Sequence, residues 1–418
     1  MTDTPTPLAE LALAGPTLHD FEAARTVVAQ VADVTPMESS RYLSTILGSP
    51  VFLKCENLQR TGSYKIRGAY NRLSKLTAEE KSRGVVAASA GNHAQGVAFA
   101  ARELGIQATI FMPVGVALPK LQATRDYGAQ VILRGHTVAE PLIAAAEYAR
   151  ETGAILIPPF DHPDVVAGAG TLGLEILDQV PDLDTVIVPI GGGGLTAGMA
   201  SVLKQYAATN GRHIRVIGVQ SENAAAYPPS LAAGEALAID ITPTMADGIA
   251  VAKPGLLNFE IIRDAVDEIV TVSEDDMARA LLVLLERAKL VVEPAGAVSV
   301  AAILAGKITA TGNTVAMLSG GNIDPLLMQR VISHGLAASG RYLKLRIMLP
   351  DRPGQLARIS ELLAEAAANV IEVLHTRHGV GLQISEVELD ISVETRGPEH
   401  RQHVVETLRA AGYDPRTD

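Results

Sequence analysis

The segment that decides the fold reads TVIVPIGGGGL and spans residues 185–195. It opens with an apolar, β-branched run, which is typical of a strand buried on both faces, and apolar residues at helical spacing follow from Leu195. Four consecutive glycines between a strand and a helix cost backbone entropy that a bound ligand would offset. Free N–H groups at a helix start favour an anion, so we expect a phosphate to be held by Gly191, Gly192, Gly193 and Gly194.

The glycine run fits neither of two common nucleotide-binding motifs. It lacks the spacing G-x-G-x-x-G, and no Lys-Ser/Thr pair follows it as in a P-loop. A flexible loop without a ligand is the alternative, but the run sits directly between a strand and a helix. The sequence therefore favours a phosphate-bearing ligand other than a dinucleotide.

Short apolar runs alternate with longer amphipathic stretches through most of the chain. Strands are predicted at residues 51–54, 84–88, 108–112, 130–133, 185–189, 215–219, 268–272 and 314–318. Helices are predicted at residues 18–34, 65–75, 92–104, 137–151, 167–179, 195–208, 273–288 and 295–304. Alternating strands and helices form parallel sheets with helices on both faces, so the predicted fold class is α/β.

The two ends of the chain depart from this rhythm. We expect residues 1–16 to form a flexible tail and residues 17–340 to form the main body. A linker is expected at residues 335–342. After a boundary near residue 341, the pattern predicts a small α+β unit of the type βαββαβ over residues 341–418. Its elements are expected at residues 343–349, 355–367, 369–376, 386–394 and 398–411, followed by a short end.

Composition narrows the class of protein. The 418 residues carry a formal net charge of −11, which disfavours a nucleic-acid partner because phosphate binding needs a basic face. Cys55 is the only cysteine, so we expect no disulfide, no thiolate metal site and a reducing cytoplasm. The start lacks the order of a signal peptide, and no apolar run reaches the roughly 18 residues that a membrane helix needs. We therefore expect a soluble cytoplasmic protein that binds no metal and no membrane.

A second segment, TGSYKIRGA at residues 61–69, places a lysine at a helix start. Ser63 is predicted to cap this helix, with Lys65 in its first turn. A cation is unfavourable there because the N-terminal end of a helix dipole is positive. The same field favours the neutral amine that a Schiff-base lysine needs. An ordinary solvated lysine near a turn is the alternative.

Two further turns follow predicted strands. The sequence SAGNHAQG at residues 89–96 joins a strand to a helix and offers free N–H groups to a carboxylate, unless Ser89 or Asn92 simply caps the helix. The sequence LSGGN at residues 318–322 puts Ser319 at the carboxyl end of a strand, where α/β sheets bind ligands. A plain turn serine is the alternative there.

These four segments occur in one order along one chain, and together they resemble the fold-type II pyridoxal-phosphate enzymes, most closely the threonine ammonia-lyases. The resemblance spans about residues 35 to 335 and includes ENLQR at 56–60, AGAGT at 167–171 and VIGVQS at 216–221. It implies pyridoxal 5'-phosphate as the cofactor. It also implies two open parallel-sheet subdomains, the smaller one at roughly residues 58–165.

The resemblance implies a role for each cofactor contact. Lys65 would form the Schiff base, with Tyr64 beside the ring. Asn92 would bind the phenolic oxygen of the ring, and Ser319 would face the pyridine nitrogen. The four glycines, together with the N–H of Leu195, would hold the phosphate.

The resemblance also implies a substrate and a reaction. The substrate carboxylate would bind the backbone of Ser89, Ala90, Gly91, Asn92 and His93, and Phe160 would give the pocket an apolar wall. Lys65 would remove the α-proton of L-threonine, which then loses water and ammonia to give 2-oxobutanoate. L-serine is expected as a secondary substrate, because one methyl group is worth only about 1–3 kcal/mol.

Three other functions share this scaffold. Serine racemases have a serine where this chain has Ala90, and acidic metal ligands where it has Gln220 and Ala226, so racemisation is disfavoured. A catalytically silent amino-acid sensor would not need Lys65. A threonine synthase would need a binding patch for a phosphorylated substrate, and we identify none.

The segment LRIMLPDRPGQLA at residues 345–357 resembles the opening of an ACT domain, a small amino-acid-binding regulatory module. Asp351, Gly354 and Asn369 match the positions expected to contact its ligand. The implied partners are a branched-chain amino-acid effector, because related enzymes open isoleucine biosynthesis, and further copies of this chain in a dimer or tetramer. A packing domain without a ligand is the alternative, and the role of Glu293 stays open.

Overall fold

The computed structural model describes residues 15–137, 139–338, 340–377, 383 and 385–417. The predicted tail at residues 1–16 lies almost wholly outside these residues. Contacts within the chain separate residues 1–327 from residues 328–418, and the predicted limits near residue 341 stay a prediction. Within the described residues, no helix is long and apolar enough to cross a lipid bilayer.

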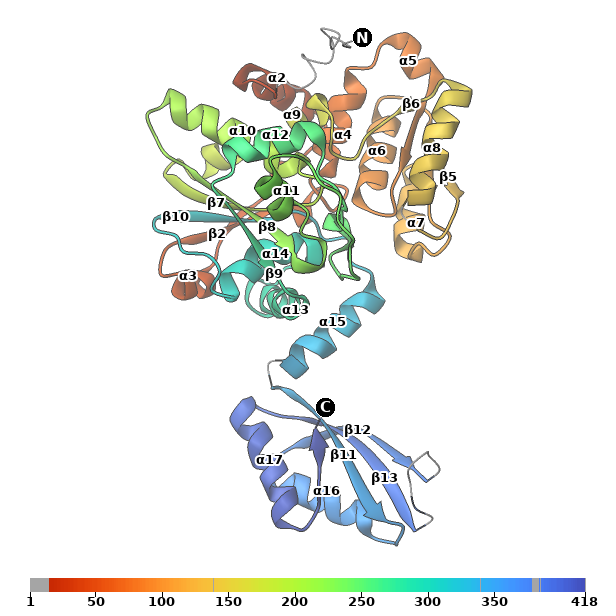
Figure 1. Ribbon diagram of the computed structural model, residues 1–418, viewed down its shortest axis with the longest axis vertical. Coiled ribbons are helices and arrows are strands. Elements are labelled where there is room, and N and C mark those ends of the chain that lie inside the picture. The colour runs from red at the N-terminus through yellow and green to blue at the C-terminus, as the bar shows by residue number, and fades with distance from the viewer. Residues whose placement is uncertain (1–14, 138, 339, 378–382, 384, 418) are drawn as a thin grey trace. The chain divides into compact units, whose positions relative to one another are not determined.

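The N-terminal unit contains a six-stranded sheet of order β1-β2-β10-β7-β8-β9 (Figure 1). Only the edge strand β1 pairs antiparallel with its neighbour. Helices α9 (Pro163–Gln179) and α10 (Gly194–Thr209) cover one face, and α14 (Pro294–Leu304) covers the other. The strands are β1 (Met37–Ser39), β2 (Val51–Cys55), β7 (Leu183–Pro189), β8 (Arg215–Ser221), β9 (Glu268–Val272) and β10 (Asn313–Leu318).

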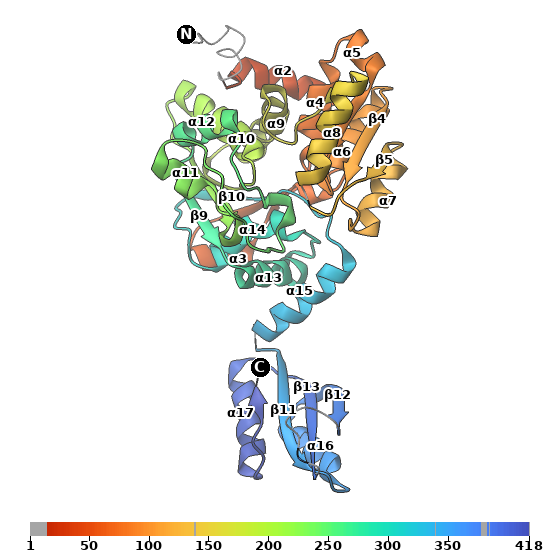
Figure 2. The same cartoon turned by 45° about the vertical axis from the view of Figure 1, so that its right-hand side comes forward.

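A second sheet in this unit, visible to the right in Figure 2, has four parallel strands in the order β5-β4-β3-β6. Helices α4 (Lys65–Ser74) and α6 (Asn92–Glu103) share one core with it, and α8 (Ala139–Thr152) packs on its other side. Ile110 faces the first core and Phe111 the second, as the alternation of a strand requires. The strands are β3 (Val85–Ala88), β4 (Ala108–Met112), β5 (Gln130–Leu133) and β6 (Ile155–Leu156). The predicted α/β class with two parallel sheets is confirmed.

The C-terminal unit has an antiparallel sheet of order β12-β13-β11-β14. Alternate residues of β11, from Leu343 to Leu349, are buried and share a core with the helices. The predicted βαββαβ order is confirmed. In chain order, its elements are β11 (Tyr342–Pro350), α16 (Gln355–Glu365), β12 (Asn369–Thr376), β13 (Glu386–Glu394), α17 (Pro398–Ala410) and β14 (Arg416–Thr417).

Two predictions on element bounds are wrong. The expected linker at 335–342 begins inside a helix, α15 (Pro325–Ala338), because a glycine such as Gly335 costs a helix only about 1 kcal/mol and need not end it. The first helix, α2 (Leu18–Val28), stops well before residue 34. Beyond it, the side chain of Gln59 binds both the N–H and the carbonyl of Asp33, a long-range contact that the local pattern does not contain.

Several short elements were not predicted. Helix α9 begins four residues before the predicted start, with His162 as its cap and Pro163 at its first position, where proline is favoured. The unpredicted elements are β1, β6, α3 (Arg41–Leu47), α5 (Ala78–Arg83), α7 (Leu118–Asp126), α11 (Tyr227–Ala233), α12 (Leu256–Ala265) and α15. The helix predicted at 273–288 is α13 (Glu274–Val283), which continues as a π-helical segment to Ala288.

A buried ionic network fixes the start of α4. The Arg67 guanidinium binds both carboxylate oxygens of Glu56 at 2.8 Å and approaches Glu175 at 2.9 Å. The Lys54 ammonium lies 2.5 Å from Glu175 and 2.8 Å from the Thr35 carbonyl. Burial opposes ionisation of Glu56, but Arg67 outweighs it and lowers the pKa of that carboxyl. Two cations and two carboxylates therefore hold β2, α4 and α9 together. One of the cations, Arg67, lies two residues after Lys65 in α4.

Replacing Arg67 with methionine should lower the free energy of unfolding by about 3–5 kcal/mol, because Glu56 and Glu175 would stay buried with too few cations. The matched control is Arg60→Met. Arg60 pairs with Asp33 at the surface, so its loss should cost no more than about 1 kcal/mol. Urea unfolding of the cofactor-free proteins measures both. Equal losses in the two variants would contradict a special role for the buried network.

Candidate active site

The four motifs of the sequence meet at the carboxyl ends of parallel strands. Ser89 follows β3, Gly191 lies just past β7, and Ser319 follows β10. The Tyr64 N–H donates to the Ser319 carbonyl at 3.1 Å, and Ser63 bridges Gly320, so the lysine segment joins the same edge. Ligands of α/β sheets bind at such an edge.

Lys65 is the first residue of α4, as predicted, but its cap differs. Tyr64 occupies the cap position without a side-chain hydrogen bond, and the buried Ser63 hydroxyl has no hydrogen-bond partner among the described groups. Ser63 bridges Gly320 by its backbone, a long-range pairing that overrides the local capping pattern. The prediction that Ser63 caps the helix is therefore wrong.

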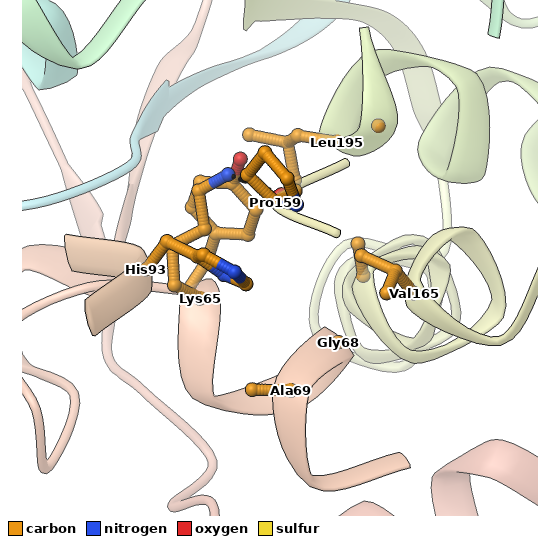
Figure 3. Close-up of a pocket in the computed structure, with 10 residues that line it drawn as sticks. Lys65, Gly68, Ala69, His93, Pro159, Val165 and Leu195 are labelled. Carbon is orange, nitrogen blue, oxygen red and sulfur yellow. Dashed lines mark hydrogen bonds between the residues drawn. The ribbon is translucent and has the colours of Figure 1, made fainter. Parts of the chain in front are cut away.

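The Lys65 amine faces a small pocket (Figure 3). Its Nζ donates to the Pro159 carbonyl at 2.8 Å and lies 5.2 Å from the centre of the Tyr64 ring. Lys65 and His93 lie on one side of the pocket, and Val165 lies on the other. In the described part of the chain, no carboxylate forms an ion pair with Lys65, so this amine is not part of a structural salt bridge.

The glycine run is a cradle that no larger residue would fit. A Cβ on Gly192 would lie 2.4 Å from the ring of Phe160, and one on Gly193 would lie 2.0 Å from the Tyr227 hydroxyl. Gly193 also has φ +100°, a value that favours glycine. Helix α10 begins at Gly194, so the N–H groups of its first turn have no partner inside the helix.

Two buried side chains hold the cradle from behind. The Gly192 carbonyl accepts from Asn258 Nδ2 at 3.0 Å, from the Tyr227 hydroxyl at 3.3 Å and from the Gly255 N–H at 3.1 Å. With this carbonyl fixed, the loop is rigid and its N–H groups can serve an anion. No local motif marks Asn258 or Tyr227, because both reach the loop from segments far away along the chain. This cradle fits the phosphate of the expected cofactor.

Asn92 begins α6 and binds protein groups through both ends of its amide. Its Nδ2 donates to Glu293 Oε1 at 2.5 Å, and its Oδ1 accepts from Asn322 Nδ2 at 2.7 Å. One N–H of the amide is left for a ligand. Ser319 is nearly buried at the end of β10.

The turn from Ser89 to His93 is fixed by one local and one long-range hydrogen bond. The Gly91 N–H donates to the Ser89 hydroxyl at 3.1 Å. The ring of His93 is buried and its Nε2 donates to the Ile157 carbonyl at 3.0 Å. Burial, helped by the charge of Lys65, lowers the pKa of His93 to about 3, so its ring is neutral near pH 7.

Beside this turn, an ion pair joins the two sheets of the unit. Lys120 of α7 lies 2.7 Å from Asp247, and its Nζ is 3.9 Å from where a Cβ of Gly91 would stand.

Phe160 and Gln220, both considered in the sequence analysis, contact other parts of the protein. The ring of Phe160 packs on Gly192, and its carbonyl accepts from Asn258 at 3.3 Å. Gln220 is fully buried and binds backbone groups, including the Tyr227 N–H at 3.0 Å. No cluster of metal-ligating side chains occurs among the residues whose positions are described.

The three predicted regulatory residues do not meet within one chain. Asp351 and Gly354 lie in the turn between β11 and α16. Asn369 starts β12 at the opposite end of the sheet, because it pairs with Glu394, which also pairs with Tyr342. The two ends of β11 lie roughly 25 Å apart, since a strand rises about 3.3 Å per residue.

Comparisons with known proteins agree with this geometry. Residues 28–320 match the family described as "Pyridoxal-phosphate dependent enzyme", and residues 344–412 match the ACT domain. An L-threonine ammonia-lyase of Geobacter sulfurreducens is 48% identical over 380 residues, which cover 91% of this chain and 94% of that protein.

Two solved structures share the fold of the N-terminal unit. Processed threonine deaminase isoform 2 from Solanum lycopersicum aligns with a TM-score of 0.71 and 37% identity, covering 77% of this chain and 94% of that chain. Maize serine racemase aligns with a TM-score of 0.70 and 33% identity, covering 78% and 99%. The fold is thus shared by enzymes of different activity. The chain belongs to the family of pyridoxal-phosphate-dependent enzymes and carries a C-terminal ACT domain.

Proposed function

We propose that this enzyme removes water and then ammonia from L-threonine to give 2-oxobutanoate, with L-serine as a second substrate. The observation that carries the proposal is the Lys65 amine, which donates to a carbonyl and faces a pocket beside a glycine cradle. The bacterial relative named L-threonine ammonia-lyase supports threonine as the substrate.

Each group at the site has a proposed task in holding the cofactor. Lys65 joins it covalently, and Tyr64 lies beside its ring. The N–H groups of residues 191–195 hold its phosphate, while Asn92 and Ser319 bind the two polar atoms of its ring. When bound, pyridoxal phosphate supplies an electron sink that makes the α-proton of an amino acid acidic.

The protein residues then carry the proton and hold the substrate. The Lys65 amine, free once the substrate amine has taken its place, would take the α-proton, and the backbone N–H groups of residues 89–93 would hold the substrate carboxylate. The α-proton and the β-hydroxyl together make up the one water lost, and the enamine left behind takes up water and releases ammonia. His93 stays neutral throughout, so it adds no charge beside the lysine.

Racemisation of serine is the alternative reaction on this scaffold. It needs a second base on the opposite face of the α-carbon, and Ala90 cannot transfer a proton. The amide of Gln220 is bound to backbone groups and carries no charge for a hard cation. These residues favour elimination.

Purified protein with pyridoxal phosphate should form 2-oxobutanoate from L-threonine, and pyruvate from L-serine with kcat/KM lower by about tenfold or more. A coupled 2-oxoacid assay measures both products, and chiral chromatography detects racemised serine. Lys65→Ala should form neither oxoacid. Racemised serine without oxoacid would overturn the proposal in favour of a racemase, and amino acids bound but unchanged would favour a sensor.

The ACT domain supports regulation by a small amino acid, and we propose isoleucine or valine as the effector. Asp351 and Gly354 lie far from Asn369 within one chain, so a ligand that touches all three needs a second copy. This supports a homo-oligomer, a dimer or tetramer. A cytoplasmic location stays a prediction.

Saturating isoleucine or valine should change the KM for threonine by about fivefold or more. Gly354→Ala should weaken this response, because φ is +90° there and a side chain strains the loop. The matched control is Gly397→Ala, which carries similar strain at φ +121° in the turn before α17 and should leave the response intact. An unchanged KM at every effector concentration would remove the proposal.

A further inference from the structure

Glu293 is a buried carboxyl group without a cationic partner among the described residues. It is 4% exposed, and its Oε1 accepts from Asn92 Nδ2 at 2.5 Å. Burying a carboxyl with so little compensation is costly, and proteins usually pair such a group with a cation. Glu56 and Glu175 of the same unit follow that rule. The exception at Glu293 calls for a reason other than stability.

The backbone around Glu293 is tied to the segment that carries Ser319. The Glu293 N–H donates to the Gly320 carbonyl at 3.0 Å, and the Glu293 carbonyl accepts from Gly296 at 2.9 Å. Glu293 occupies the cap position of α14, yet its side chain makes no capping bond and reaches Asn92 instead. The side chain therefore serves the site and not the helix.

Two glycines make this reach possible. A Cβ on Gly320 would lie 2.2 Å from Glu293 Oε1 and 3.1 Å from Asn92 Nδ2. A Cβ on Gly296 would lie 2.4 Å from the Gly320 carbonyl. Neither glycine has a positive φ, so the need for glycine at both positions is one of space.

The Asn92 amide can take only one orientation here. Its oxygen accepts from Asn322, whose Nδ2 also donates to the Thr61 carbonyl at 2.8 Å. Its nitrogen faces the Glu293 carboxyl, which accepts hydrogen bonds. A rotation of the amide by 180° would set nitrogen against nitrogen at Asn322 and oxygen against oxygen at Glu293.

We propose that Glu293 is a positioning residue that fixes the Asn92 amide so that its second N–H is presented to the cofactor ring. This inference rests on the role proposed above for Asn92. Glu293 itself acts through Asn92. It links the two polar contacts of the ring, because its side chain holds Asn92 while its backbone holds the residue that follows Ser319.

The charges around Glu293 are consistent with this role. Burial and, less strongly, Asp247 raise the pKa of Glu293 to about 7, although Lys120, the bond from Asn92 and Lys65 each act to lower it. A carboxyl group keeps an acceptor oxygen whether or not it is ionised. The bond to Asn92 therefore persists in both forms.

The test compares Glu293→Gln, which keeps an acceptor oxygen, with Glu293→Leu, which keeps the approximate volume and removes it. Cofactor-free protein is titrated with pyridoxal phosphate, and the dissociation constant and the absorption spectrum of the bound form are recorded. The leucine variant should bind about tenfold more weakly and show an altered spectrum, whereas the glutamine variant should stay within about threefold of the parent.

A double-mutant cycle separates positioning from a general loss of structure. In an Asn92→Ala background, Glu293→Leu should weaken cofactor binding no further, because the bond it breaks is already gone. Asp276→Asn is the control for losing a nearly buried carboxylate elsewhere, in the first turn of α13. It should lower the melting temperature of the cofactor-free protein without changing the spectrum of the bound cofactor.

Parent-like affinity and spectrum in Glu293→Leu would overturn the inference, and so would additive effects in the cycle. These readouts use the cofactor alone. A protein that binds it normally and does not turn over threonine would count against the proposed reaction and leave the inference on Glu293 intact.

Discussion

Helix α4 carries Lys65, and it packs so closely against α6 and α9 that no side chain fits between the backbones at the contact points. A Cβ on Gly96 would lie 3.1 Å from the Lys65 backbone, and one on Gly168 would lie 2.4 Å from the Arg67 carbonyl. The ionic network of Arg67 also ties the same helix to Glu175 of α9 and to Glu56, which follows β2. The amine therefore reaches the pocket from a helix that has little freedom to shift.

Glycines also allow close packing of the backbone at the other end of the site. Gly192, Gly193 and Gly194 let a loop pass against Phe160 and Tyr227, and buried donors fix the Gly192 carbonyl. Close backbone packing thus positions both the helix that carries the Lys65 amine and the glycine loop. The side chains of Asn92 and Glu293 meet across a gap left by Gly320.

The four motifs could be recognised in the sequence because each one is local. A buried strand, a glycine or serine turn and a helix start follow one another within about ten residues, and parallel strands bring such turns to one edge. Contacts between segments that lie far apart along the chain leave no local sequence motif. They include the hydrogen bond from Asn258 to the Gly192 carbonyl, the bonds between Gln59 and the backbone of Asp33 and the pairing of Ser63 with Gly320. The separation of Asn369 from Gly354 follows from topology: β11 and β12 both pair antiparallel with β13, so both start at one end of the sheet, whereas Gly354 follows the other end of β11.

The central claim is that one amine, at residue 65, forms a covalent bond to the cofactor. The most direct measurement is borohydride reduction of the protein with bound pyridoxal phosphate, followed by proteolysis and mass spectrometry of the peptides. The account predicts a pyridoxyl group on the peptide that contains Lys65. A group fixed only to another lysine, such as Lys120, or no fixed group at all, would contradict it.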